Sequence, residues 1–248
     1  MNKESIFESF IVQNYIAHRG FHNSTFPENS LGAFQNAIDN NYAIELDVQL
    51  LKDNTVAVFH DKKLARMTNK DGYIQNLTKD DLSNHKLLDT EYTIPTLEEV
   101  FKLVDGKVGI LIEIKNETTK TGKLEKEVCK LIRNYNGPVA IQSLNPLSLE
   151  WFSKYAPNVL RGQLSYFFND ESAKNVSWFK RFALKRMMLN KRSKPDFISY
   201  SVLNLPNRYV KKYKDLPLIG WTVKSQEQYR NISKYVDNII FEDFEPKI

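Results

Sequence analysis

The 248-residue sequence predicts an α/β fold, a (β/α)8 TIM barrel. Eight short runs rich in β-branched residues alternate with segments of helical periodicity, and a chain of this length suits such a barrel. No GxGxxG follows the first run, which disfavours the competing open doubly wound sheet. Ionisable residues gather at the ends of the runs, which is where barrels of this type carry their chemistry.

The predicted strands follow one another along the whole chain. Each is a short apolar run bounded by polar or turn residues. We expect strands at residues 14–18, 44–48, 109–114, 139–143, 160–164, 197–201, 218–222 and 238–242.

Five helices are expected between these strands. Apolar residues recur there at helical spacing over residues 31–38, 97–104, 124–135, 147–155 and 229–235. Three of the helix starts carry cap signals. Thr96 and Glu99 form a capping box, Pro146 takes a first helical position, and Ser225 precedes Gln228.

One interval breaks this alternation. Residues 61–93 are polar and weakly periodic, so we expect a small insertion over the C-terminal face of the barrel. The whole chain, residues 1–248, is expected to form one domain with this insertion.

Composition excludes several classes of protein. With 42% hydrophobic residues the chain can bury a full core, and a single cysteine, Cys129, rules out an intrachain disulfide. The net charge is +5, but residues 172–195 hold eight basic and no acidic residues, so the rest is net acidic and a nucleic-acid partner is not expected. Acidic residues and no long apolar run at the start predict no secretory signal, no membrane span and a cytoplasmic protein.

Three carboxylates are expected to meet at the carboxyl ends of two strands. Side chains alternate along a strand, so Glu45 and Asp47 point to the same side, as do Glu113 and Lys115. Neighbouring carboxylates repel unless a cation joins them. Oxygen ligands without thiolates suit a hard ion, so we predict one divalent cation, Mg²⁺ or Ca²⁺, at this cluster.

The other ionisable residues of this rim suit an anionic phosphoryl group. Arg19 and Lys115 supply positive charge for the phosphoryl oxygens. His18 and His60 titrate near neutral pH, so one can accept a proton from a nucleophile while the other donates one to a leaving oxygen. The sequence does not assign which histidine is the acid.

The ordered motifs of the chain resemble those of the glycerophosphodiester phosphodiesterase (GDPD) family. They are HRG at 18–20, PENS at 27–30, ELD at 45–47, FHD at 59–61, EIK at 113–115, QS at 142–143 and WTV at 221–223. The resemblance implies a phosphatidylinositol-phospholipase-C-like barrel and metal-dependent hydrolysis of a glycerophosphodiester to glycerol 3-phosphate and an alcohol. It also implies the same acid–base, metal and phosphate roles for the residues already singled out. One departure is Glu242-Asp243, where relatives often carry a Thr-Asp pair.

Several other residues have two interpretations. Glu28 either places a negative charge at a helix start or orients the rim arginine. Gln142 either satisfies backbone groups or, as we favour, contacts the substrate, and Trp221 belongs either to the core or to a wall against the alcohol. His22 and His85 lie in polar loops and are expected to be surface residues.

Two other functions use the same or a similar scaffold. A lysophospholipase D-like or sphingomyelinase D-like enzyme would need an apolar slot for an acyl chain, which aromatic residues near Trp178, Phe179 and Phe182 could offer. A non-catalytic binding module would have lost part of the cluster, and nothing is missing here.

The basic segment 174–194 also has two interpretations. We favour a barrel crossover with a solvated basic side over an element that makes weak contact with anionic membrane surfaces. The sequence leaves the alcohol preference and the oligomeric state open.

Overall fold

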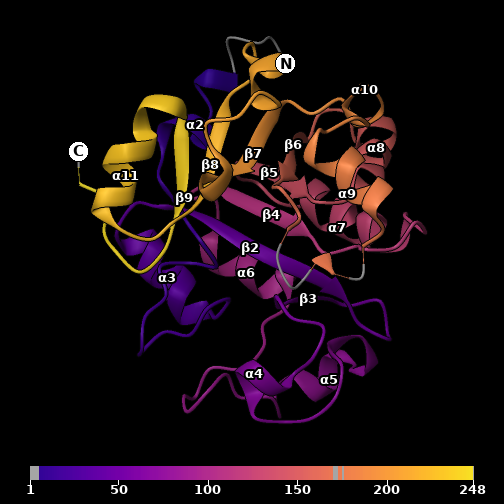
Figure 1. The fold of residues 1–248 in the computed structure, drawn as a ribbon. Coiled ribbons are helices and arrows are strands. Elements are labelled where there is room, and N and C mark those ends of the chain that lie inside the picture. Colours follow the sequence, from indigo (N-terminus) through magenta and orange to yellow (C-terminus); the bar gives the residue numbers. More distant parts are fainter. Residues whose placement is uncertain (1–5, 170–172, 175, 248) are drawn as a thin grey trace.

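A computed structural model describes residues 6–169, 173–174 and 176–247. Eight parallel strands form a closed barrel, because β1 pairs with both β2 and β9 (Figure 1). The strands are β1 (Ile16–Ala17), β2 (Ala43–Leu50), β4 (Ile110–Ile114), β5 (Val139–Ser143), β6 (Leu160–Ser165), β7 (Phe197–Ser201), β8 (Leu218–Val223) and β9 (Asn238–Phe241). The predicted barrel and all eight of its strands are confirmed.

Five helices stand where the sequence places them. They are α3 (Leu31–Asp39), α6 (Leu97–Val104), α7 (Lys123–Arg133), α8 (Pro146–Tyr155) and α11 (Gln226–Ile232). The expected caps form, since the side chains of Thr96, Asn145 and Ser225 each accept a bond from a backbone N–H in the first turn. Outside the segment that follows β2, the described residues also form α2 (Phe10–Gln13), α9 (Trp178–Lys185), α10 (Asn190–Ser193), η3 (Val202–Asn204), η4 (Val210–Tyr213) and η5 (Ser233–Tyr235).

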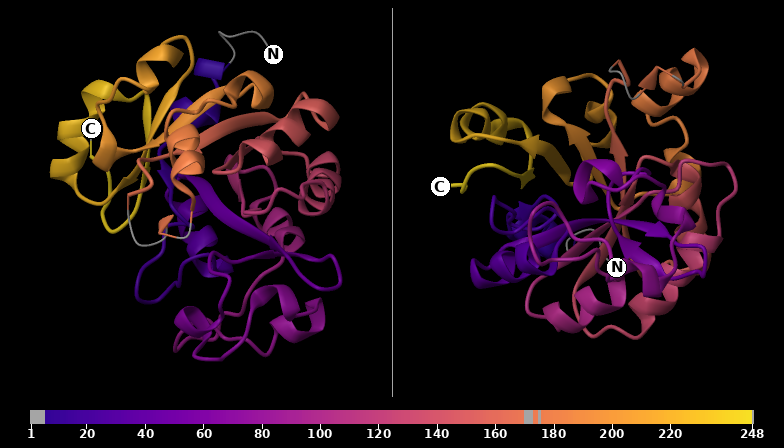
Figure 2. Two further views of the ribbon diagram at one scale, coloured as in Figure 1. Left: turned by 45° about the vertical axis from the view of Figure 1, so that its right-hand side comes forward. Right: turned by 90° about the horizontal axis from the view of Figure 1, so that it is seen from below.

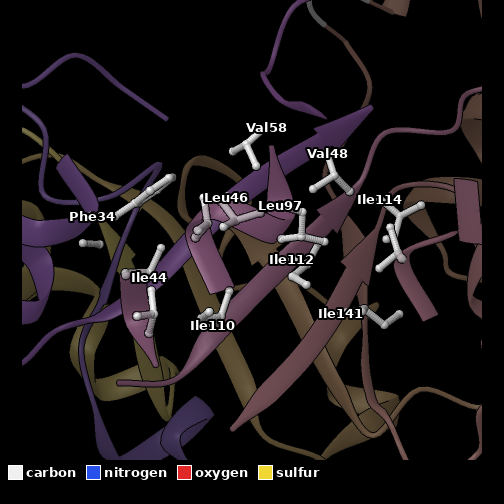
Figure 3. Close-up of a cluster of buried hydrophobic side chains, with 14 of the residues drawn as sticks. Phe34, Ile44, Leu46, Val48, Val58, Leu97, Ile110, Ile112, Ile114 and Ile141 are labelled. Carbon is white, nitrogen blue, oxygen red and sulfur yellow. The ribbon is translucent and has the colours of Figure 1, made fainter. Parts of the chain in front are cut away.

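The main core lies between the barrel wall and its helices. Ile44, Leu46 and Val48 of β2 are buried in this layer, which Figure 3 shows in close-up. Because side chains alternate along a strand, Glu45 and Asp47 face the barrel interior instead. A second apolar cluster, which draws on β1 and on several other strands, is buried separately from the first. Outward apolar packing therefore fixes which carboxylates point inward.

The segment after β2 forms a separate small layer. β3 (Val56–Val58) pairs antiparallel with β2, and α4 (Ala65–Thr68), η1 (Ile74–Asn76) and α5 (Lys79–Leu82) follow it. Most of its buried apolar residues form a cluster of their own, whereas Val56 and Val58 of β3 belong to the barrel core. Figures 1 and 2 show this insertion projecting from the end of the barrel at which β2 finishes. Within the described part of the chain, no helix combines the length and apolar character needed to cross a bilayer.

Candidate active site

A cavity of about 500 Å³ opens where the barrel strands end. Eight of the predicted site residues line it, namely His18, Arg19, Glu45, His60, Glu113, Lys115, Gln142 and Trp221. The other two predicted residues contact Arg19 of this lining. Asp47 is buried beside it, and Glu28 forms an ion pair with it. None of residues 61–93 lines this cavity, but Asp61, Lys62 and Arg66 of the insertion line a neighbouring cavity together with His60 and Lys115.

The three predicted metal ligands form one cluster. Glu45, Asp47 and Glu113 are buried, and one oxygen from each lies within 4.8 Å of the others. The register of the sheet causes this, because Asp47 on β2 is paired directly with Glu113 on β4. The carboxylates share one face of two neighbouring strands, as the alternation of side chains predicts.

Two basic side chains partly balance these carboxylates. Lys115 Nζ lies 2.8 Å from Glu113 Oε1 and 3.1 Å from Asp47 Oδ1, and Arg19 Nε lies 3.3 Å from Asp47 Oδ2. Burial alone would raise the pKa of Asp47, but Lys115 and Arg19 hold that pKa well below its usual range. Burial and the neighbouring carboxylates Asp47 and Glu113 raise the pKa of Glu45 well above its usual range. The cluster is therefore short of positive charge.

This donor set fits a hard divalent cation. Asp47 Oδ1 is buried and accepts no hydrogen bond from any described residue, although the Lys115 ammonium lies close to it. A free oxygen in a cluster that lacks positive charge is what an oxygen-ligated ion would use. Glu45, Asp47 and Glu113 could together hold such an ion.

Both histidines are held by a carboxylate on the same ring nitrogen. His18 Nδ1 is hydrogen-bonded to Glu242 Oε2, and His60 Nδ1 lies 2.6 Å from Asp61 Oδ1. Both rings line the cavity, and their Nδ1 bonds leave Nε2 of each ring available to a substrate there. His18 Nε2 lies 3.9 Å from Glu45 Oε2. Burial lowers the pKa of His18, and its bond to Glu242 opposes that shift.

Glu242 is a site residue that the sequence reasoning missed. It lines the cavity, its Oε2 lies 3.7 Å from His22 Nε2, and it forms an ion pair with the exposed Lys224. Burial would raise the pKa of Glu242, but its hydrogen bond with His18 and the nearby His22 and Lys224 hold that pKa well below the usual range. The sequence offered one signal for this role, because Glu242 belongs to the Glu242-Asp243 pair that departs from the family motif. His22 lies at the edge of this network rather than on the open surface, whereas His85 bonds a backbone carbonyl in the insertion.

A tight turn after β1 aims Arg19 at the cluster. Arg19 has a φ of 56°, and its backbone N–H donates to Glu45 Oε2 at 3.1 Å. Gly20 has a φ of 81°, and a Cβ there would come within 2.8 Å of the Ala33 backbone. Only glycine fits this position, which explains the HRG motif in physical terms. Arg19 Nη1 donates to Glu28 Oε1 at 2.7 Å, so Glu28 orients Arg19, and Ser30 caps the nearby helix.

The PENS loop supplies a second residue that the sequence reasoning missed. Asn29 is buried, has a φ of 57°, and donates from Nδ2 to Asp47 Oδ2 at 3.0 Å. Its backbone N–H donates to the Arg19 carbonyl at 2.9 Å. Asparagine tolerates this left-handed conformation better than most residues do. Asn29 therefore joins the HRG turn to the carboxylate cluster.

Gln142 and Trp221 line the cavity with surfaces of different polarity. Gln142 is buried on β5, its Nε2 lies 3.4 Å from Glu45 Oε1, and its Oε1 has no hydrogen-bond partner among the described residues. Trp221 is partly buried, packs beside the second apolar cluster and lines the cavity. Gln142 thus offers the cavity a free acceptor, and Trp221 offers it an apolar surface.

Comparison with known proteins agrees with this geometry. The sequence matches the Glycerophosphoryl diester phosphodiesterase family over residues 18–245. It is 36% identical over 154 residues to a glycerophosphodiester phosphodiesterase of Bacillus altitudinis. That match covers 58% of this chain and 62% of the relative, which is less than two thirds of the relative's length.

Two solved structures share the fold over nearly the whole chain. A glycerophosphodiester phosphodiesterase from Thermotoga maritima is 26% identical with a TM-score of 0.70, covering 92% of this chain and 93% of that one. A phosphodiesterase from Oleispira antarctica, solved with the product sn-glycerol-3-phosphate, has a TM-score of 0.75 at 20% identity and covers 94% and 93% of the two chains. The family match over most of the chain places this protein in the glycerophosphoryl diester phosphodiesterase family.

Proposed function

We propose that this protein hydrolyses glycerophosphodiesters to glycerol 3-phosphate and an alcohol, in the cytoplasm, with one divalent cation. The observation that carries the proposal is a single cavity that joins two carboxylate-held histidines, buried carboxylates, an arginine and a lysine. Family membership supports the reaction class. No other cluster of described residues offers three possible metal ligands.

The charged residues would bind the phosphodiester. Glu45, Asp47 and Glu113 would hold Mg²⁺ or Ca²⁺, which when bound draws negative charge from the phosphoryl oxygens. Arg19 and Lys115 would pair with the non-bridging oxygens as charge builds on them. Both side chains already lie against the cluster, so little reorganisation is needed.

The two histidines would move the protons. The Nε2 of one ring accepts a proton from the nucleophile, which is either water or the glycerol hydroxyl next to the ester. The nucleophile forms the new P–O bond while the bond to the alcohol breaks. Attack by water gives glycerol 3-phosphate directly, whereas attack by the glycerol hydroxyl gives a cyclic phosphodiester that water opens in a second step. The Nε2 of the other ring gives its proton to the departing alkoxide. Asp61 and Glu242 fix the Nδ1 side of each ring, which leaves Nε2 as the reactive atom.

The first experiment combines a substrate panel with metal removal. Glycerophosphocholine, glycerophosphoethanolamine and related diesters are assayed after EDTA and after Mg²⁺, Ca²⁺ or Mn²⁺ is added back. We expect EDTA to abolish turnover and one of these ions to restore it. His18→Ala and His60→Ala should each lower kcat by about 10²-fold or more. His85→Ala, in the insertion, is the matched control. Normal turnover by either His18 or His60 variant would remove the two-histidine mechanism.

A second candidate function is supported by a side cavity of about 220 Å³. This side cavity shares Glu113, Lys115, Leu144 and Tyr166 with the catalytic cavity. Its remaining wall includes the apolar side chains Pro146, Phe168, Val176 and Leu184. A chamber with one apolar side next to the reacting centre suits the acyl chain of a lysophospholipid.

Turnover of glycerophosphocholine and of lysophosphatidylcholine separates the two candidates. A chain-binding enzyme should show the higher kcat/KM with the lysolipid, and Leu184→Trp should lower that value selectively by filling the chamber. If Leu184→Trp lowers kcat/KM equally for both substrates, or if the wild-type chain does not turn over the lysolipid, only the first candidate function remains.

A further inference from the structure

Helix α9 presents aromatic rings and basic side chains to solvent. No residue of this helix is buried, and the side chains of Trp178 and Phe179 are each 69% exposed. Lys180 is exposed beside them, and Arg181 and Lys185 are partly exposed. We call these five residues the α9 patch. Large exposed apolar side chains in a row usually mark a contact surface.

The charges of the α9 patch are unbalanced. Among the described residues, no carboxylate forms an ion pair with Lys180, Arg181 or Lys185. In α10, by contrast, Arg192 lies 2.8 Å from Glu150. The patch therefore combines free positive charge with exposed rings, a combination that attracts an anionic and partly apolar surface.

The α9 patch lies next to the active site. Lys180 and Leu184 of α9 line the side cavity, and Lys115 and Glu113 of the catalytic cavity line it too. Figure 1 shows α9 at the outside of the barrel, near α7 and α8. A surface that met the patch would therefore stand beside the route into the catalytic cavity.

We propose that the α9 patch docks on the surface of a bilayer that contains anionic lipids. Trp178 and Phe179 would enter the headgroup layer, and the three basic side chains would lie against the lipid phosphates. A duplex nucleic acid fits less well, because its charged backbone offers no apolar layer for the exposed rings of Trp178 and Phe179. Docking itself does not depend on the reaction proposed above. If that reaction also holds, its substrates include phosphodiesters presented at a bilayer.

Vesicle sedimentation tests the docking directly. The full chain is spun at low salt with phosphatidylcholine vesicles and with vesicles in which phosphatidylglycerol replaces part of that lipid. We expect pelleting with the anionic vesicles alone and a steep loss of pelleting as salt is raised. Arg181→Gln with Lys185→Gln should lower the partition constant about 25-fold, at roughly fivefold for each charge. Trp178→Ala with Phe179→Ala should lower it by about tenfold or more.

Matched variants and a second readout separate docking through α9 from a general loss of charge or aromatic surface. Lys211→Gln with Lys212→Gln removes two exposed charges elsewhere, and Tyr155→Ala with Tyr235→Ala removes two exposed rings; neither pair should change the partition constant. The tryptophan emission should shift to shorter wavelength on anionic vesicles, and Trp178→Ala should abolish the shift. Turnover of soluble glycerophosphocholine should be unchanged in the α9 variants, which separates docking from the proposed activity.

Three results would overturn the proposal. The first is no pelleting with anionic vesicles at low salt. The second is equal pelleting by the wild-type chain and both pairs of α9 variants. The third is binding to a single-stranded polynucleotide, but not to vesicles, that is lost in the α9 variants, which would assign the patch to nucleic acid.

Discussion

The two active-site histidines are each held by a carboxylate, but from very different distances along the chain. Asp61 follows His60 directly, whereas Glu242 reaches His18 from the residue just after the last strand, 224 positions away. The first contact is visible in the sequence as His-Asp. The second arises only because β1 and β9 are neighbours in the closed barrel. At the scale of residues, the role of Glu242 is therefore a product of the fold.

Glu242→Gln tests that role. It keeps the size of the side chain but removes the charge that favours the protonated form of His18. We expect kcat to fall by about tenfold or more, though less than in His18→Ala, with KM little changed. The limb of the pH–rate profile that belongs to His18 should move to lower pH, because its pKa loses the support of Glu242. Glu242→Asp should recover part of both effects. An unshifted profile with normal kcat would mean that Glu242 does not position His18.

Asn29→Ala tests whether this residue supports the proposed metal ligands. The substitution removes the hydrogen bond to Asp47 Oδ2 and leaves the Ser30 cap of α3 in place. Loss of such a partner typically weakens metal affinity by about tenfold or more. Calorimetric titration with Mg²⁺ or Ca²⁺ measures the change. Unaltered metal affinity would mean that Asn29 stabilises the PENS loop and does not support metal binding.

At the scale of elements, one arginine of the insertion contacts two carboxylates that support the active site. Arg66 in α4 donates to Glu28 and Asp61, the same carboxylates that hold Arg19 and His60. The insertion thus touches the site through its second layer of contacts, although it does not line the cavity. Its polar sequence predicted an insertion, but its weak periodicity gave no sign of this contact, which depends on residues 38 positions apart.

Arg66→Ala should lower the free energy of unfolding by an amount that depends on pH. Burial would raise the pKa of Glu28, but Arg66 and Arg19 lower it, and the pKa of Asp61 is likewise lowered against its burial. A lowered folded-state pKa stabilises the fold above the ordinary value near pH 4, and that stability is lost as the pH falls through the folded-state value. We expect Arg66→Ala to cost roughly 1 kcal/mol at neutral pH and less as the pH falls below about 4.

Denaturant unfolding across this pH range measures the effect. Lys79→Ala is the control from the same insertion, because Lys79 and its partner Glu98 are both exposed. A cost of Arg66→Ala that stays constant from neutral to acid pH would show that the stabilisation does not come from these carboxylates.

At the scale of the whole molecule, the barrel and most of the cluster could be predicted from the sequence. Period-two strands, helix caps and the inward side of β2 are local properties, so Glu45, Asp47 and Glu113 could be assigned to one rim in advance. Asn29 and Glu242 could not, because each depends on which loop or strand lies next to another after the barrel closes. The contacts between the insertion and the active site could not be predicted from the sequence for the same reason.

Calorimetric titration shows whether one divalent ion binds at Glu45, Asp47 and Glu113, as we propose. We expect one Mg²⁺ or Ca²⁺ per wild-type chain, and affinity at least about tenfold weaker in Glu45→Gln and in Glu113→Gln. Glu117→Gln, an exposed partner of Lys62 two residues beyond Lys115, should bind as the wild type does. Wild-type affinity in the Glu45 and Glu113 variants, or no binding by the wild-type chain, would contradict the account.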